Sequence, residues 1–72
     1  MLNFEACVIE ILRREDVNSF EMAAVAKKVD SEEVYTLYKP LIENHLIQRD
    51  IAFTDNDVYQ VALKMYQILK EY

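Results

Sequence analysis

Hydrophobic residues recur at intervals of three and four along most of the chain, which is the spacing of an amphipathic helix. We expect a first helix over residues 2–15, with an apolar stripe formed by Phe4, Val8, Ile11 and Leu12. Asn18, with Glu21 three residues later, resembles a capping box, which predicts the start of a second helix. The apolar stripe of this second helix consists of Met22, Val25, Ala26 and Val29.

The third predicted helix carries the clearest stripe of the chain. It begins at Asp30 and Glu33, which again pair a side-chain acceptor with an acid. Its stripe is Val34, Leu37, Tyr38, Leu41 and Ile42. Pro40 removes one backbone hydrogen bond, so we expect a bend toward the core rather than a break. Asn44 and His45 predict the helix end, because asparagine tolerates a left-handed cap and the helix dipole favours histidine. A ligand role for His45 is the alternative.

The hydrophobic period changes after this helix. Apolar and polar residues alternate over residues 46–53, on both sides of residues 49–50, as in two short strands joined by a tight turn. The alternating residues are Ile47, Ile51 and Phe53. Residues 54–57 then predict the start of a fourth helix that runs to the end of the sequence. Its core stripe is Val58, Val61, Ala62, Met65, Ile68, Leu69 and Tyr72. The predicted fold class is mainly α with a small β-hairpin, in the order helix, helix, helix, hairpin, helix.

Composition sets the class of protein. The chain has 72 residues, a size at which a single core is only marginally stable without further support. Its 53% of hydrophobic residues and net charge of −5 indicate a globular chain, and no apolar run is long enough to cross a membrane. The first residues lack the basic region of a secretory signal. Cys7 is the single cysteine, and we expect a buried small hydrophobe rather than a nucleophile. These features predict a cytoplasmic protein.

Several kinds of chemistry lack the residues that they need. The chain has no glycine, which phosphate-cradling and dinucleotide-binding loops require. One histidine and one cysteine cannot supply the four ligands of a structural zinc site. The acidic segment 55–57 fails as a calcium loop because Tyr59 takes the next ligand position, so a helix start is the better interpretation. We expect no enzymatic activity, no metal or cofactor, and no small-molecule substrate.

Residues 18–53 combine a short helix, a tight turn, a longer helix ending near Leu46-Ile47 and a hairpin. This order resembles the winged helix-turn-helix superfamily. With the first and last helices, the resemblance covers nearly the whole chain as one winged-helix-like domain, residues 1–72. In that family the third helix enters the major groove of DNA. The resemblance implies a regulatory role in transcription or a related machine.

The exposed face of the predicted third helix departs from a DNA-binding surface. It carries Glu32, Glu33, Thr36, Lys39, Pro40 and Glu43. Carboxylates repel phosphates, which bind largely to lysine and arginine. We therefore expect this face to bind a protein partner, as in a regulator or adaptor. The other interpretation of the acids is a solvated helix surface, where the dipole favours acids near the N-terminus. The alternative function is a dimeric DNA-binding regulator, with backbone contacts from Lys27, Lys28 and Arg49.

The predicted fourth helix, residues 55–72, is apolar over an unusually wide arc. Tyr59, Leu63 and Tyr66 form a second strip beside its core stripe. One small domain should not need both strips, so we expect the second strip to join two copies of the chain in a homodimer. The alternative is that this strip packs over the first helix of the same chain.

Overall fold

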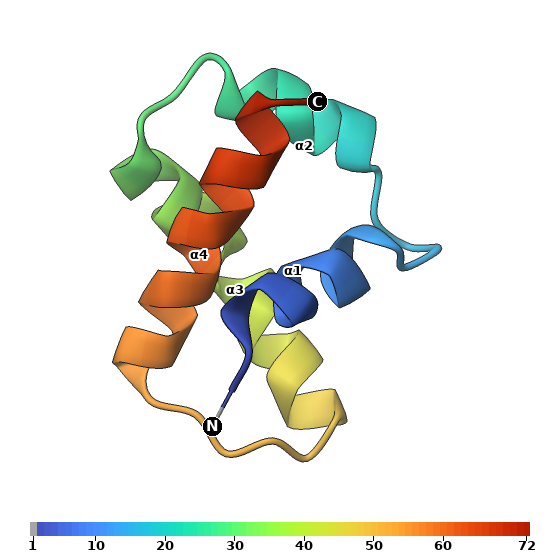
Figure 1. Ribbon diagram of the computed structural model, residues 1–72, viewed down its shortest axis with the longest axis vertical. Helices are drawn as coiled ribbons and strands as arrows, with labels where there is room; N and C mark the ends of the chain where they lie inside the picture. The colour runs from blue at the N-terminus through green and yellow to red at the C-terminus, as the bar shows by residue number, and fades with distance from the viewer. Residues whose placement is uncertain (1) are drawn as a thin grey trace.

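The chain folds into four helices, as a computed structural model that describes residues 2–72 shows (Figure 1). The helices are α1 (Phe4–Leu12), α2 (Ser19–Ala26), α3 (Ser31–Gln48) and α4 (Asp55–Lys70). The expectation of a mainly helical chain is confirmed. Residues 2–72 contain no strand, so the predicted hairpin is wrong, and with it the winged helix-turn-helix architecture.

Each helix begins with a side chain that caps its first turn. The side chains of Asn3, Asn18 and Asp30 each accept a hydrogen bond from the backbone N–H three residues later. Thr54 and Asp57 form a reciprocal capping box at 2.9 and 3.1 Å. These bonds satisfy N–H groups that have no partner inside the helix, which confirms the predicted starts of α2, α3 and α4.

Helix α4 is the centre of the fold. It packs against each of the other three helices, most extensively against α3, and it passes through the middle of the view in Figure 1. Its buried residues are Val58, Val61, Ala62, Met65 and Leu69. The other three helices contribute a few core residues each, including Cys7, Val8, Ile11, Met22, Ala26, Val34, Ile42 and Leu46. A helix that meets three neighbours needs an apolar arc wider than one that meets a single neighbour.

Residues 46–51 form the C-terminal cap of α3 instead of a hairpin. The helix continues beyond the end predicted at Asn44 and His45 and ends at Gln48. Asp50 adopts a left-handed conformation with φ 56°. The N–H of Asp50 donates to the carbonyl of Ile47, and the N–H of Ile51 donates to that of Leu46, at 3.0 Å each. This pair of bonds is a Schellman motif, in which an apolar residue after the cap packs near the last turn. That pairing explains the alternating pattern that resembled strands.

The apolar stripe of α3 is displaced from the predicted one. At about 100° per residue, Val34, Tyr38, Ile42 and His45 lie within about 80° of one another. This arc faces the core, and three of the four side chains are buried. Leu37 lies about 60° beyond its edge and is 53% exposed, so its predicted place in the core is wrong. The helix runs unbroken through Pro40, which is exposed on the far side, as expected for a proline that does not end the helix.

Candidate functional site

The outer face of α3 is the surface for which the sequence predicted a partner. It comprises the residues of α3 that lie away from the core, namely Glu32, Glu33, Thr36, Leu37, Lys39, Pro40, Glu43, Asn44 and Ile47. Lys39 and Glu43 are half-buried and the others are exposed. The exposed fractions of Leu37 and Ile47 are 53% and 62%. Together with Pro40 they lie within an arc of about 80° and form an apolar strip along this face, which Glu33 precedes and which the exposed Asn44 interrupts between Pro40 and Ile47.

Carboxylates flank the apolar strip. Glu32 and Glu33 lie in the first turn of α3, where the helix dipole favours acids, and within residues 2–72 neither of them takes part in an ion pair. An open hollow of about 460 Å³ at this end of the face is lined by Asp30, Glu32, Glu33, Thr36 and Leu37. The Nζ of Lys39 lies 5.6 Å from the centre of the Tyr35 ring, within range of a cation–π contact. The outer face is therefore acidic around an apolar strip.

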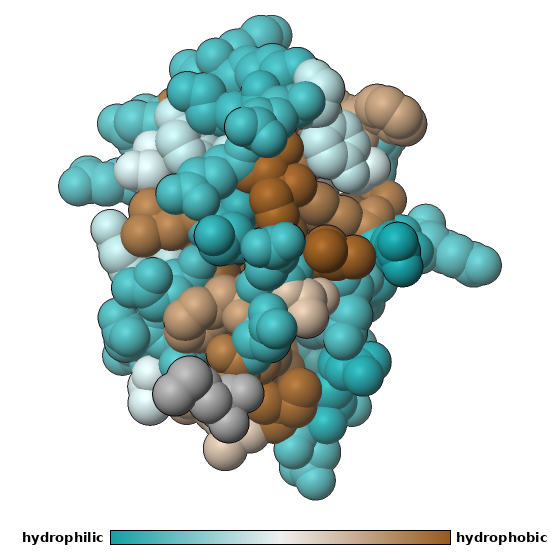
Figure 2. All heavy atoms as spheres, viewed as in Figure 1, coloured by the Kyte–Doolittle hydropathy of each residue, from teal (hydrophilic) through white to brown (hydrophobic). Residues whose placement is uncertain are grey.

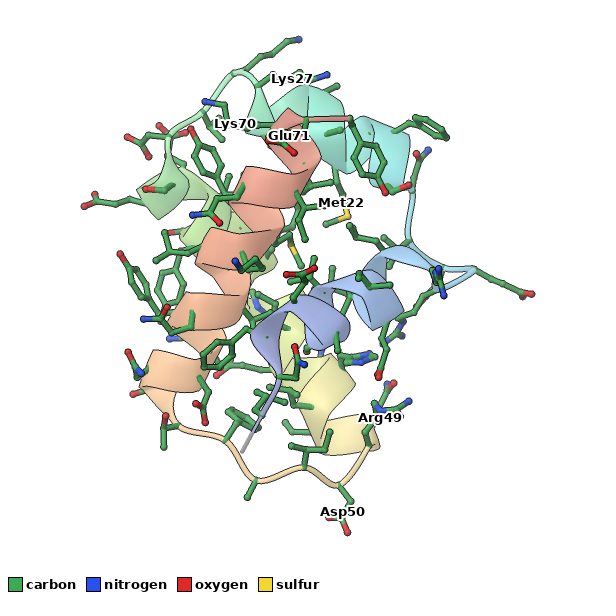
Figure 3. All side chains as sticks on the ribbon, in the orientation of Figure 1. Met22, Lys27, Arg49, Asp50, Lys70 and Glu71 are labelled. Atoms are coloured by element: carbon green, nitrogen blue, oxygen red, sulfur yellow. The ribbon has the colours of Figure 1, made fainter. Side chains whose placement is uncertain are left out.

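The three cations predicted to contact a nucleic-acid backbone do not form one surface. The Nζ of Lys27 donates to the backbone carbonyl of Tyr72 at 2.8 Å. The Nε of Arg49 lies 3.2 Å from the Oε1 of Glu10 in an ion pair. Figure 3 shows Lys27 and Arg49 near opposite ends of the long axis of the molecule. Lys28 lies beside Lys27 and is exposed.

The strip predicted to join two copies of the chain has partners within the chain. The ring of Tyr59 packs edge-on against Tyr35 of α3, with 5.5 Å between the ring centres. The hydroxyl of Tyr66 donates to the carbonyl of Val29 at 3.3 Å. Leu63 is half-buried and Tyr59 is 40% exposed. These contacts lie on α3 and the turn before it, and not on α1 as the alternative expected. On the face that carries α4, hydrophobic atoms form patches among hydrophilic ones (Figure 2).

A polar network around the buried side chain of His45 was missed by the sequence reasoning. His45 is 5% exposed, although its position near a helix end predicted a terminal residue. The Nη1 of Arg14 lies 3.1 Å from Nδ1 of His45, and the Oε1 of Glu10 lies 3.4 Å from its Nε2. Because a guanidinium can only donate, Nδ1 must accept, which places the ring proton on Nε2 facing Glu10. His45 in this arrangement links α1 to α3.

Ion pairs extend this network to the surface. Arg14 donates two hydrogen bonds to Asp16, at 2.9 and 2.8 Å. This pairing lowers the pKa of Asp16 and raises that of Arg14. Glu10 also pairs with Arg49, so α1 is tied to the end of α3 at two points. Glu10 and Arg14 are four residues apart, as are His45 and Arg49, but this spacing does not show which residues meet across the helices.

Cys7 is buried beside the His45 network, as expected of a small core residue. Burial raises the pKa of its thiol, the charge of Glu10 raises it further, and Arg49 lowers it. A hollow of about 120 Å³ touches Cys7, Glu10 and His45. In the described part of the chain, no group of three histidine, cysteine, aspartate or glutamate side chains is placed to hold a metal ion.

A groove between α2 and α3 is a second feature that the sequence reasoning missed. Its volume is about 340 Å³, and its apolar residues are Val17, Met22, Val25, Tyr38 and Leu41. Asp16, Asn18 and Glu21 supply its polar lining. Burial raises the pKa of the Tyr38 hydroxyl, and the nearby charge of Glu21 raises it further. The groove adjoins the outer face of α3, because Leu41 lies one helical turn after Leu37.

No protein-family model, no curated protein and no solved structure matches the chain. None of the helices within residues 2–72 is both long enough and apolar enough to span a lipid bilayer.

Proposed function

We propose that the protein is a non-enzymatic binding module, a regulator or adaptor, whose protein partner contacts the outer face of α3. The observation that carries the proposal is the apolar strip of Leu37, Pro40 and Ile47 on a helix face whose charged side chains are three carboxylates and one lysine, Lys39. Apolar side chains that lie together on an exposed face are typical of surfaces that meet another protein. The resemblance that suggested transcription supports no such assignment, because the wing on which it relied is missing from residues 46–54.

The electrostatics of this face support a protein partner over DNA. A duplex would bring its phosphates close to Glu32 and Glu33, and removing these carboxylates from water beside like charges is unfavourable. Lys27 and Arg49, two of the cations that the DNA alternative requires, are engaged within the chain and lie far apart (Figure 3). A protein partner can place an apolar surface against Leu37 and basic side chains against the acids, so it matches both properties of the face.

Selection of peptides from a random library displayed on phage tests this function and requires no identified partner. The full chain serves as bait, and the affinity of each selected peptide is measured by fluorescence anisotropy for the wild type and for variants. We expect Leu37→Ser with Ile47→Ser to weaken binding about tenfold or more. Phe20→Ser is the matched control, because Phe20 lies on α2 and is 79% exposed. Peptides that bind the double variant as well as they bind the wild type would contradict the proposal.

Titration with mixed-sequence duplex DNA tests the alternative. Electrostatic attraction is strongest at low salt, so a DNA-binding surface must show itself there. We expect no binding at low salt, and Glu32→Gln with Glu33→Gln should leave any weak affinity unchanged or increase it. Specific binding that this double variant abolishes would instead assign the two carboxylates to base recognition, as acids can achieve at cytosine.

A further inference from the structure

The groove between α2 and α3 extends the apolar strip of the outer face. Val25, Tyr38 and Leu41 are half-buried in its walls, so each side chain is partly open to solvent. Met22 lies deeper and is 8% exposed. Leu37 lies one turn before Leu41 on the same edge of α3, so the apolar surface runs from the groove to the outer face. The result is a continuous apolar path bounded by two helices.

The charged residues that line the groove and the hollow at the start of α3 have one sign. The groove and the hollow at the start of α3 are lined by the acids Asp16, Glu21, Asp30, Glu32 and Glu33, and no lysine or arginine of residues 2–72 lines either of them. Asp16 is compensated by Arg14, which donates two hydrogen bonds to it. Within the same residues Glu21 takes part in no ion pair. The helix dipole suffices to explain Glu21, Glu32 and Glu33 in the first turns of α2 and α3, and it is the place of the acids around an apolar path that points to a ligand.

We propose that the groove receives an amphipathic helix of the partner protein, with apolar side chains between Met22 and Leu41 and lysine or arginine side chains facing Glu21 and Glu33. The inference rests on the proposed function and adds the chemistry of the partner. An amphipathic helix in an apolar groove is a common mode of recognition, in which side chains three and four residues apart act as anchors. Acids at the rim repel nucleic acids and anionic lipids, and they attract a basic segment.

Three synthetic peptides of equal length test this chemistry on the full chain. The first has leucines at helical spacing among lysines, the second has the same composition in scrambled order, and the third has glutamate in place of lysine. Fluorescence anisotropy should show the first peptide binding at least about tenfold more tightly than the other two. Its affinity should fall as salt is added, because the rim charges are screened. Equal affinity for the first and scrambled peptides overturns the groove as an acceptor of a helix.

Variants locate the binding site. Glu21→Gln with Leu37→Ser removes one rim charge and one exposed apolar side chain, and should weaken binding of the first peptide about tenfold. Glu5→Gln with Ile9→Ser is the matched control, because this acid and this 39% exposed isoleucine line a separate hollow on α1. The control should change affinity less than about twofold. A control that loses as much affinity as the groove variant overturns the inference. Circular dichroism of both variants establishes that each is folded.

The outcomes separate this inference from the proposed function. Phage-selected peptides that depend on Leu37 and Ile47 but lack basic residues would leave the function standing and overturn the basic partner. If the wild type self-associates and Leu37→Ser abolishes this self-association, the groove binds a second copy of the chain, and the inference is overturned. In nuclear magnetic resonance spectra of the complex, the amide signals of Met22, Tyr38 and Leu41 should shift on addition of the first peptide. Shifts confined to α1 would show that the peptide binds outside the groove and would overturn the inference.

Discussion

Two leucines of α3 provide a direct test of the packing. Leu46 is fully buried, with 0% exposure, whereas Leu37 is 53% exposed on the same helix. Replacing either by alanine removes the same three carbon atoms, so the two variants differ only in their surroundings. Removing three buried carbon atoms costs about 2.5 kcal/mol in transfer free energy, to which a cavity term is added. We therefore expect Leu46→Ala to lower the free energy of unfolding by about 3 kcal/mol, within a usual range of about 2 to 5 kcal/mol.

The same substitution at Leu37 should have a much smaller effect. About half of the transfer free energy is at stake, and the higher helix propensity of alanine offsets a few tenths of a kcal/mol. We expect a loss of about 1 kcal/mol or less. A chain of this length has a total stability of roughly 4 to 11 kcal/mol, so Leu46→Ala removes a large part of it and Leu37→Ala does not.

Urea unfolding followed by far-ultraviolet circular dichroism measures both losses. Linear extrapolation gives the free energy of unfolding, and thermal scans should show a shift of about 4 to 8 °C for each kcal/mol lost. The hollow beside Leu46 can admit water after truncation, which would place its loss toward the lower end of the range. A loss at Leu37 equal to or greater than the loss at Leu46 would refute the assignment of the core face of α3.

The remaining predictions concern the cap, the thiol and the oligomeric state. Asp50→Gly should raise the free energy of unfolding by about 0.5 to 1 kcal/mol in urea titrations, because Asp50 has φ 56° and glycine adopts this conformation without strain. Burial raises the pKa of Cys7 above its ordinary value of 9.0, so the thiol should react slowly with a disulfide reagent in the native state. The contribution of this pKa difference to stability is present below pH 9.0 and is lost as pH rises through the pKa of the folded state. The free energy of unfolding, measured at successive pH values for the wild type and for Cys7→Ala as a reference, tests this dependence. A homodimer through α4 requires the exposed parts of Tyr59 and Leu63 to contact a second copy of the chain. Sedimentation should then show a dimer at micromolar concentration, which Tyr59→Glu with Leu63→Glu dissociates. A monomeric wild type would contradict the homodimer and show that the strip contacts only residues of its own chain.

Local signals in the sequence were sufficient to predict the starts of α2, α3 and α4, whereas α1, expected over residues 2–15, covers only Phe4–Leu12. Asn18, Asp30 and Thr54 each supply a side-chain oxygen at the position where backbone N–H groups lack partners, and these interactions involve only neighbouring residues. Most of the core stripe of α4 was predicted for a similar reason, since its apolar spacing is regular over the whole helix, but Tyr72 lies beyond the helix end and is 48% exposed, so its predicted place in the core is wrong.

Features that depend on distant residues could not be predicted in this way. The alternation over residues 46–53 has a local period of two, but Leu46 and Ile51 come together across a helix cap, and a left-handed aspartate allowed that cap without glycine. The exposure of Leu37 depends on the rotation of α3 against α4, which the stripe alone did not fix. The buried His45 is paired with Arg14, just after α1, and with Glu10 of α1, thirty-one and thirty-five positions earlier in the chain.

The outer face of α3 and the groove were predictable to different degrees. The acids Glu32, Glu33 and Glu43 were assigned to the exposed side of the helix from the wheel, and the structure places them on that side. The apolar strip beside them was hidden, because Leu37 was assigned to the core. The groove was not foreseen, since it exists only when α2 and α3 are set at a distance by their separate packing on α4.

The central position of α4 has a consequence for the order of events during folding. Helices α1, α2 and α3 bury their apolar residues mainly against α4, which comes last in the sequence, and they contact one another less. On a ribosome, residues 2–54 therefore leave the exit tunnel before the segment that completes their core has been released. Short helices are marginal in water when their apolar faces have no partner. The nascent chain must then remain open until residues 55–70 emerge, and the domain forms as a single cooperative unit after that point.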